Sequence, residues 1–125
     1  MGWDIAARGF KVVLSAEVPE LTRRHLRGDV DGFLAEHGLV RSQISRWIAH
    51  PGGPRVLQAV EEALELAPEA LEISWRSLRE TGNLSSTSVL LVLREGLGRP
   101  PAAGSYGLLL AMGPGFCSEL VLLQW

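Results

Sequence analysis

Residues 47–54 read Trp47-Ile48-Ala49-His50-Pro51-Gly52-Gly53-Pro54. An apolar run ends here at a histidine, and the proline that follows holds this histidine in extended backbone. The two glycines then allow a sharp turn, and Pro54 suits the first position of a helix. The stretch therefore predicts a strand, a turn and a helix start, with one imidazole presented at the end of the strand.

Further elements are predicted on the carboxyl side of this stretch. Apolar and acidic residues segregate to opposite sides of a helix over 54–66, and Pro68 begins another helix that runs to about Glu80. Residues 85–97 are apolar nearly all round, which predicts a buried helix. Residues 98–104 form an exposed loop. Two apolar strands, 106–112 and 117–125, flank Gly113-Pro114-Gly115 and predict an antiparallel hairpin.

On the amino side, residues 10–14 predict a strand and residues 45–49 a short buried strand. A helix is expected between them, from about Pro19 to Glu36, with Gly28 and Gly32 weakening or splitting it and Gly38 ending it. No helix or strand is expected before residue 10. The order β-α-β-α-α-α-β-β predicts an α/β fold whose helix-covered mixed sheet ends in an antiparallel hairpin.

Composition limits the function classes. At 125 residues the chain predicts a single domain over 1–125, and 46% of its residues are hydrophobic. Its mean hydropathy of +0.15 indicates a sheet covered on both faces or a large surface for a partner. A net charge of −2 provides no strong field for nucleic acid or an anionic membrane, so neither partner is expected.

The cysteine and histidine content limits the kinds of site and the cellular location that are expected. The single cysteine, Cys117, excludes an internal disulfide, fits a cytoplasmic location and is expected to be a small core residue. The three histidines lack metal-ligand spacing, so no metal is expected. The first residues show no signal-peptide pattern, and no apolar run approaches the ~18 residues of a membrane span.

Two residues carry the chemistry that the pattern favours. Asn83 lies between Gly82 and an apolar helical stretch, in a setting similar to that of His50. An imidazole and a carboxamide presented in this way can polarise a thioester carbonyl together. The structural alternatives are a strand-end histidine bonded to a backbone carbonyl and an asparagine that caps a helix. Arg55 lies beside the same helix start, where free amides attract anions.

Four segments carry a family resemblance: 9–19 (GFKVVLSAEVP), 47–54 (WIAHPGGP), 81–89 (TGNLSSTSV) and 113–116 (GPGF). In this order and spacing they resemble the C-terminal domain of bacterial type III polyketide synthases, the chalcone and stilbene synthase family. The resemblance implies one half of a thiolase-like fold, usually in a homodimer. It also implies a Cys-His-Asn triad that condenses malonyl-CoA, with decarboxylation, onto an acyl-CoA starter. Coenzyme A thioesters are the substrates, and no separate cofactor is implied.

The resemblance assigns roles to individual residues. His50 and Asn83 match the triad histidine and asparagine. Gly52 and Arg55 match positions near the pantetheine arm of coenzyme A, and Ser85 matches a position that lines the cavity. The resemblance also places Val12 where plant members carry a gatekeeping phenylalanine, and Gly113, Pro114 and Gly115 in the cavity loop. Ala111 and Met112 replace the Gly-Phe that normally begins this loop.

The resemblance also implies an incomplete catalytic site. The family's nucleophilic cysteine belongs to an N-terminal half that this sequence lacks, so the chain is expected to be truncated at its N-terminus and inactive alone. Its partner would be that half or a full-length synthase. Two alternatives remain: a non-catalytic remnant or interaction module of the same fold, and a fragment of a ketoacyl synthase. The latter typically has Gln-Ala-Asn after the histidine, where this chain has Pro51-Gly52-Gly53.

Overall fold

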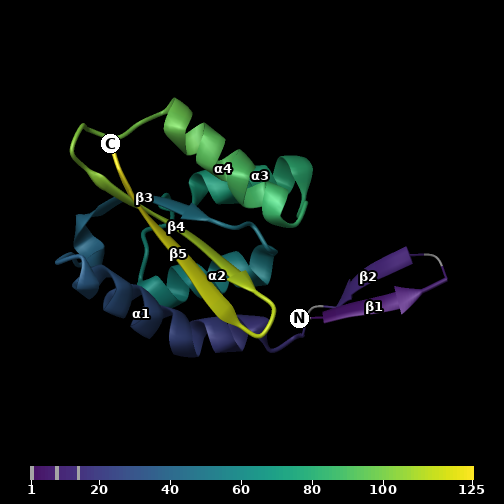
Figure 1. Ribbon diagram of the computed structural model, residues 1–125. Helices are drawn as coiled ribbons and strands as arrows, with labels where there is room; N and C mark the ends of the chain where they lie inside the picture. Colours follow the sequence, from purple (N-terminus) through teal and green to yellow (C-terminus); the bar gives the residue numbers. More distant parts are fainter. Residues whose placement is uncertain (1, 8, 14) are drawn as a thin grey trace.

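A three-stranded mixed sheet forms the centre of the molecule. The computed structural model describes residues 2–7, 9–13 and 15–125, and the side chains of residues 2, 3 and 10–13 lie outside this description. Strand β3 (Ile44–Ala49) runs parallel to β4 (Tyr106–Gly113), and β4 pairs antiparallel with β5 (Cys117–Gln124). The expected mixed sheet with an antiparallel C-terminal hairpin is therefore confirmed (Figure 1).

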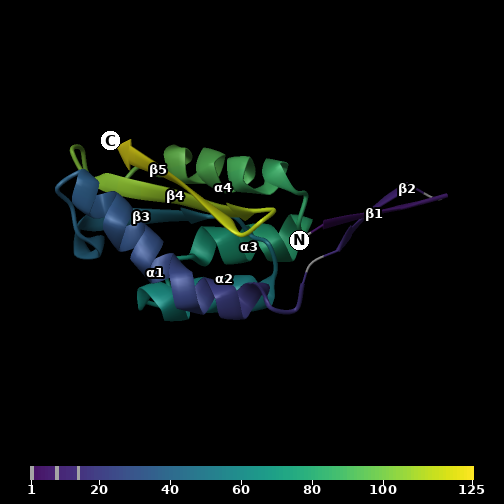
Figure 2. The ribbon, with the colours of Figure 1, turned by 60° about the horizontal axis from the view of Figure 1, so that its bottom comes forward.

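Helices cover both faces of this sheet. Helices α1 (Val18–Glu36) and α2 (Pro54–Leu64) lie on one face, and α4 (Ser86–Gly98) lies on the other (Figure 2). Helix α3 (Glu72–Thr81) packs against α4, and a 3-10 turn, η1 (Arg41–Gln43), leads into β3. Helix α3 begins four residues later than predicted, because Pro68 to Leu71 form turns rather than a first helical turn.

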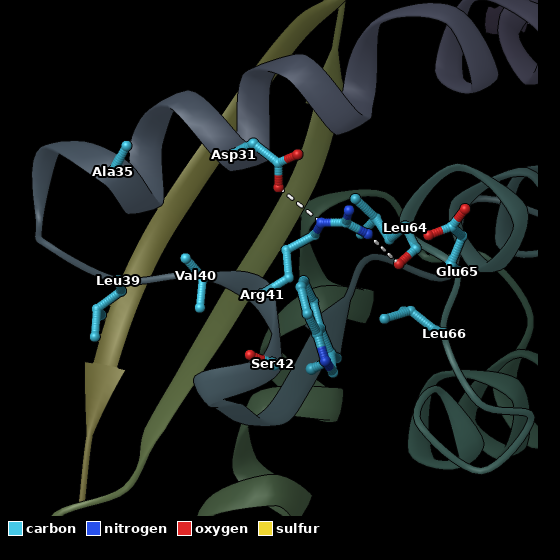
Figure 3. Close-up of a pocket in the computed structure, with 10 residues that line it drawn as sticks. Asp31, Ala35, Leu39, Val40, Arg41, Ser42, Leu64, Glu65 and Leu66 are labelled. Atoms are coloured by element: carbon cyan, nitrogen blue, oxygen red, sulfur yellow. Dashed lines mark hydrogen bonds and ion pairs between the residues drawn. The ribbon is translucent and has the colours of Figure 1, made fainter.

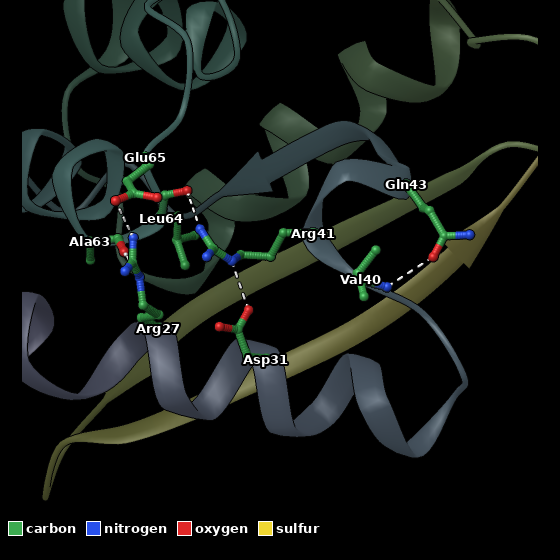
Figure 4. Close-up of polar contacts among 8 residues, drawn as sticks. All are labelled: Arg27, Asp31, Val40, Arg41, Gln43, Ala63, Leu64 and Glu65. Carbon is green, nitrogen blue, oxygen red and sulfur yellow. Dashed lines mark hydrogen bonds and ion pairs between the residues drawn. The ribbon is translucent and has the colours of Figure 1, made fainter.

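Helix α1 is continuous, although Gly28 and Gly32 were expected to weaken or split it. Its inner side buries Leu26, Val30 and Leu34 completely, and this packing outweighs the low helix propensity of glycine. Helix α1 is also tied to the end of α2. The side chain of Arg27 contacts the Ala63 carbonyl oxygen at 3.0 Å and the Glu65 carboxylate at 2.6 Å (Figure 4).

A strand precedes residue 10, so the expectation of no earlier element is wrong. Strand β1 (Gly2–Ala6) pairs antiparallel with β2 (Gly9–Val13). Gly9 has a φ of +115°, a backbone conformation that glycine adopts without steric cost, and this allows the tight return. The two strands form a separate ribbon that projects from the body near the start of α1 (Figure 1).

Helix α4 is not buried all round. Ser88, Val92 and Gly96 face the sheet, whereas Leu90 is 59% exposed and Leu97 53% exposed. The sheet covers one side of the helix, and α3 packs beside it. The sequence is apolar on the remaining side as well, but no described residue of the chain covers that side.

Candidate functional site

The His50 loop has the predicted geometry of strand, turn and helix start. The His50 amide donates to the Leu110 carbonyl at 2.9 Å, which extends the pairing of β3 with β4 by one residue. The Gly52 amide then bonds back to the His50 carbonyl at 2.8 Å and closes a tight turn. The amides of Val56 and Leu57 bond to the Gly53 carbonyl, so α2 begins directly after this turn.

The imidazole of His50 is half-buried and has two different edges. A Cβ atom built on Gly52 would lie 3.5 Å from Cδ2 and 3.7 Å from Nε2 of the ring, so this edge faces the turn. The opposite nitrogen, Nδ1, is buried and has no hydrogen-bond partner among the described residues. Burial lowers the pKa of His50, which favours the neutral imidazole near neutral pH.

Asn83 contacts the His50 loop. It follows Gly82, where the backbone leaves α3 with a φ of +72°. Its Nδ2 donates to the Gly52 carbonyl at 3.0 Å, and its Oδ1 accepts from the Ser85 amide at 2.9 Å. Asn83 therefore orders the turn before α4, as the capping alternative required, and also holds the loop that carries His50. Its amide nitrogen has a second N–H available for an external acceptor.

Two further predicted residues lie close to this contact. Ser85 is the residue before α4 and has a φ of +57°, which is uncommon for a residue other than glycine. The Leu84 amide donates to Ser88 Oγ, and the Ser88 amide donates to the Ser85 carbonyl, so this strained turn is closed by two hydrogen bonds. Arg55 is exposed in the first turn of α2, three residues after Gly52.

The Gly113-Pro114-Gly115 segment forms the turn between β4 and β5. It extends from the carboxyl end of β4, the same edge at which β3 ends, and the start of α4 lies at this end too (Figure 2). The turn is held by α1. Asp29 accepts a 2.7 Å hydrogen bond from Ser118, and the ring centroids of His25 and Phe116 lie 6.1 Å apart.

Two predicted residues do not join this cluster. Val12 lies in the β1–β2 ribbon, and its side chain is outside the described part of the structure. Cys117 is exposed, so the expectation that it is a core residue is wrong. It begins the edge strand β5, where exposed and half-buried residues alternate over most of the strand.

Sequence reasoning missed two serines of α3. Ser74 is fully buried and donates to the Ala49 carbonyl at 2.8 Å, which fixes α3 against the end of β3. Ser77, one turn later, is also buried. The signal was a pair of serines three residues apart on the apolar side of an amphipathic helix, where polar side chains usually require a specific partner.

A hollow of the structure lies elsewhere. It has a volume of about 560 Å³ and lies beside η1 and the end of α2, where Arg41 contacts Asp31 and the Leu64 carbonyl (Figure 3). None of its ten lining residues is a predicted site residue. The described residues contain no group of three potential metal ligands. They also contain no helix that is long and apolar enough to cross a bilayer.

Comparison with known proteins identifies relatives over the whole chain. Residues 2–125 match the family described as chalcone and stilbene synthases, C-terminal domain. The chain is 58% identical to a 1,3,6,8-tetrahydroxynaphthalene synthase of Streptomyces peucetius subsp. caesius, covering 100% of this chain and 33% of that protein. It is 41% identical to a putative chalcone synthase of Bacillus subtilis, with coverage of 100% and 34%.

A solved structure supports the same assignment. The 1,3,6,8-tetrahydroxynaphthalene synthase of Streptomyces coelicolor, a bacterial type III polyketide synthase, matches with a TM-score of 0.89 and 34% identity. The match covers 99% of this chain and 36% of that one. The thiolase-like fold expected from the resemblance is thus confirmed. The chain spans about a third of the length of the relatives it matches.

Proposed function

Because the chain belongs to the chalcone and stilbene synthase C-terminal domain family, we propose that it supplies the histidine and asparagine of a type III polyketide synthase site. In this proposal His50 and Asn83 act on coenzyme A thioesters, and the nucleophilic cysteine comes from another part of the enzyme. The reaction is a decarboxylative condensation of malonyl-CoA with an acyl-CoA starter.

One observation carries the proposal. Asn83 Nδ2 donates to the carbonyl of Gly52, and a Cβ built on Gly52 would lie 3.7 Å from Nε2 of the His50 ring. The Asn83 side chain therefore reaches the turn that follows His50, although the two residues are 33 positions apart in the sequence. A lone strand-end histidine or a helix-capping asparagine would not require this contact.

The chemistry follows from the charge that develops during reaction. Loss of carbon dioxide from a malonyl thioester leaves an enolate, whose negative charge on the thioester oxygen is absent from the ground state. Neutral His50, protonated at Nε2, and the second N–H of Asn83 are the donors that we assign to this oxygen. Donors held in place before the reaction stabilise the transition state more than the substrate, and this accelerates the step.

The remaining roles complete the proposal. Arg55, at the exposed start of α2, and Gly52 would hold the coenzyme A arm, since helix N-termini and arginine favour phosphate groups. Ser85, Val12 and the Gly113-Pro114-Gly115 turn would border the acyl cavity. Cys117 is not the nucleophile in this scheme, because it lies on the exposed edge strand rather than at a helix start.

The proposal extends to partners and location. The exposed leucines of α4 make a homodimer, or packing against an N-terminal half, the expected state of the working enzyme. The presence of a single cysteine and the use of coenzyme A thioesters favour the cytoplasm.

A chimera tests the proposal. Residues 1–125 would replace the corresponding third of the Streptomyces peucetius synthase, to which they are 58% identical. With malonyl-CoA, we expect His50→Gln and Asn83→Ala each to lower kcat roughly 10²–10³-fold. The matched control is His37→Gln, since His37 lies at the far end of α1. Full activity of both site variants would contradict the proposal.

The isolated chain provides a second test. Incubated with malonyl-CoA and an acyl-CoA, it should form no polyketide, because no acyl-enzyme can form without the nucleophile. Product detected by mass spectrometry from the chain alone would show that its catalytic site is complete, contrary to the division of roles proposed above.

A further inference from the structure

Two buried polar atoms near the site lack partners. Nδ1 of His50 and Oγ of Ser77 are both inaccessible to solvent, and neither has a hydrogen-bond partner among the described residues. Ser77 as a whole is 8% exposed. Buried donors and acceptors in native proteins are usually paired, so two unpaired atoms on neighbouring segments suggest a link between them.

Two hydrogen bonds bring the Ser77 segment alongside the His50 loop. Ser74, on α3, donates to the Ala49 carbonyl at 2.8 Å. Asn83, just after α3, donates to the Gly52 carbonyl at 3.0 Å. The loop residue that follows Ala49 is His50, so the imidazole lies between these two fixed points.

Ser77 lies between the same two points on the other segment. It follows Ser74 by three residues, which puts both on one side of α3. At 1.5 Å per residue, Ser77 lies about 4.5 Å further along the axis toward Asn83. Both serines are buried, as expected if they lie on the same inward-facing side of α3.

The orientation of the ring agrees with this placement. The Cδ2–Nε2 edge of the imidazole faces Gly52 and the turn. Nδ1 lies on the opposite edge and is buried, so it points toward the protein interior rather than toward a bound thioester. Burial also lowers the pKa of His50, as expected for a ring whose inner edge is enclosed by the protein.

We propose that the Ser77 hydroxyl is linked to His50 Nδ1 through one bridging water and thereby orients the imidazole. The inference rests on the proposed function. A hydroxyl and a water both donate and accept, so this link can accept from Nδ1–H of a protonated His50 and donate to bare Nδ1 of a neutral one. The second state leaves Nε2–H free to donate to the thioester oxygen.

Nuclear magnetic resonance of the 125-residue chain tests this link without any activity measurement. The pKa and tautomer of His50 would be followed in ¹⁵N-histidine-labelled protein carrying Ser77→Val or Ser77→Thr. These two variants have side chains of the same shape, and only threonine retains a hydroxyl. Ser42→Ala, at an exposed serine of η1, is the control for the removal of a serine elsewhere.

We expect Ser77→Val to lower the pKa of His50 by about half a unit to one unit, because the protonated ring loses the acceptor for Nδ1–H. The same variant should lower the share of the Nε2–H tautomer, because bare Nδ1 loses the donor that stabilises this form. Ser77→Thr and Ser42→Ala should leave both properties close to those of the unsubstituted chain. Equal shifts in the valine and threonine variants, or no shift in either, would overturn the assignment.

The chimera separates this inference from the proposed function. There Ser77→Val should lower kcat more than it changes KM and should shift the acidic limb of the kcat–pH profile, whereas Ser77→Thr should restore both. If Ser77→Val leaves the profile unchanged while His50→Gln lowers kcat as expected, the Ser77 link is wrong and the proposed function stands. If His50→Gln has no effect, the proposed function fails, whatever the resonance data show.

Discussion

The two faces of the β3-β4-β5 sheet differ in how completely they are covered. The face under α1 and α2 belongs to a cluster of fourteen buried residues, which includes Leu26, Leu57 and Leu108. The opposite face contributes to a cluster of three buried residues, Ile48, Ile73 and Val92. The first face is fully covered, whereas the second is covered by α4, whose outer side is exposed, with α3 packed beside it.

This difference matters for the site. The strand end that carries His50 packs into the fully covered face, because Trp47 and Ala49 belong to the large cluster. Asn83 comes instead from the junction of α3 and α4, on the thinly covered face. The hydrogen bond from Asn83 to Gly52 of the His50 loop therefore joins the fully covered face to the thinly covered one. Alignment of the two donors thus depends on how firmly α4 is held.

The largest expected effect is the difference in stability lost when one leucine is truncated on each face of the sheet. Leu57→Ala, at a fully buried position of α2, should lower the free energy of unfolding by about 3 kcal/mol, because it leaves a cavity in the large cluster. Leu90→Ala, on the exposed side of α4, should change it by less than about 0.5 kcal/mol. Urea unfolding followed by tryptophan fluorescence measures both. Similar losses for the two variants would mean that α4 is covered in solution.

A smaller effect probes the contact that holds α4 to the sheet. A Cβ on Gly96 would lie 2.6 Å from Ile48 Cδ1, and Ile48 is fully buried. We expect Gly96→Ala to destabilise the chain by about 1 kcal/mol, because overpacking outweighs the gain in helix propensity. Adding Ile48→Val removes Cδ1 and should make the double variant more stable than the sum of the two single effects.

Gly98 provides the matched control for that substitution. It lies at the end of the same helix, and a Cβ there would meet nothing within 4 Å. Gly98→Ala should therefore leave the urea midpoint unchanged or slightly raised. A loss as large as that of Gly96→Ala would point to the helix backbone rather than to the contact with Ile48.

The smallest effect concerns the ion pair between Arg27 of α1 and Glu65 at the end of α2, on the fully covered face. The hydrogen bond and charge of Arg27 lower the pKa of Glu65 below its ordinary value of 4.5. A carboxylate whose pKa is lowered by folding stabilises the native state above its unfolded pKa, and this contribution is lost as the pH falls through the folded value. Glu65→Gln should thus lower Tm slightly at about pH 7.

The same substitution should have a progressively smaller effect on Tm as the pH is lowered from about 7 to about 3, because the carboxylate takes up a proton as the pH falls through its lowered pKa. Both groups are largely exposed, so the difference at neutral pH should also shrink in high salt. Scanning calorimetry of the two proteins at both pH values checks the sign. An equal loss of Tm at both would show that the side chain acts through packing.

Local patterns predicted most elements near the site. Pro51, Gly52, Gly53 and Pro54 punctuate the chain so strongly that β3, the turn and the start of α2 follow from them alone. The β1 strand was missed because its five residues show no apolar alternation long enough to distinguish it from loop, and it forms only by pairing with β2. Ser77 was missed because its role depends on a loop 27 residues earlier.

The sequence by itself determined the positions of the helices and most strands, the turn that presents His50, and the motifs that indicate the family. These features arise from backbone preferences and periodicity within a few residues. Only the tertiary structure decided that Asn83 reaches the His50 loop, that Leu90 stays exposed and that Cys117 lies on an open edge. Each of these depends on how segments far apart in the chain pack together, and an apolar pattern indicates what can be buried without specifying which neighbour will cover it.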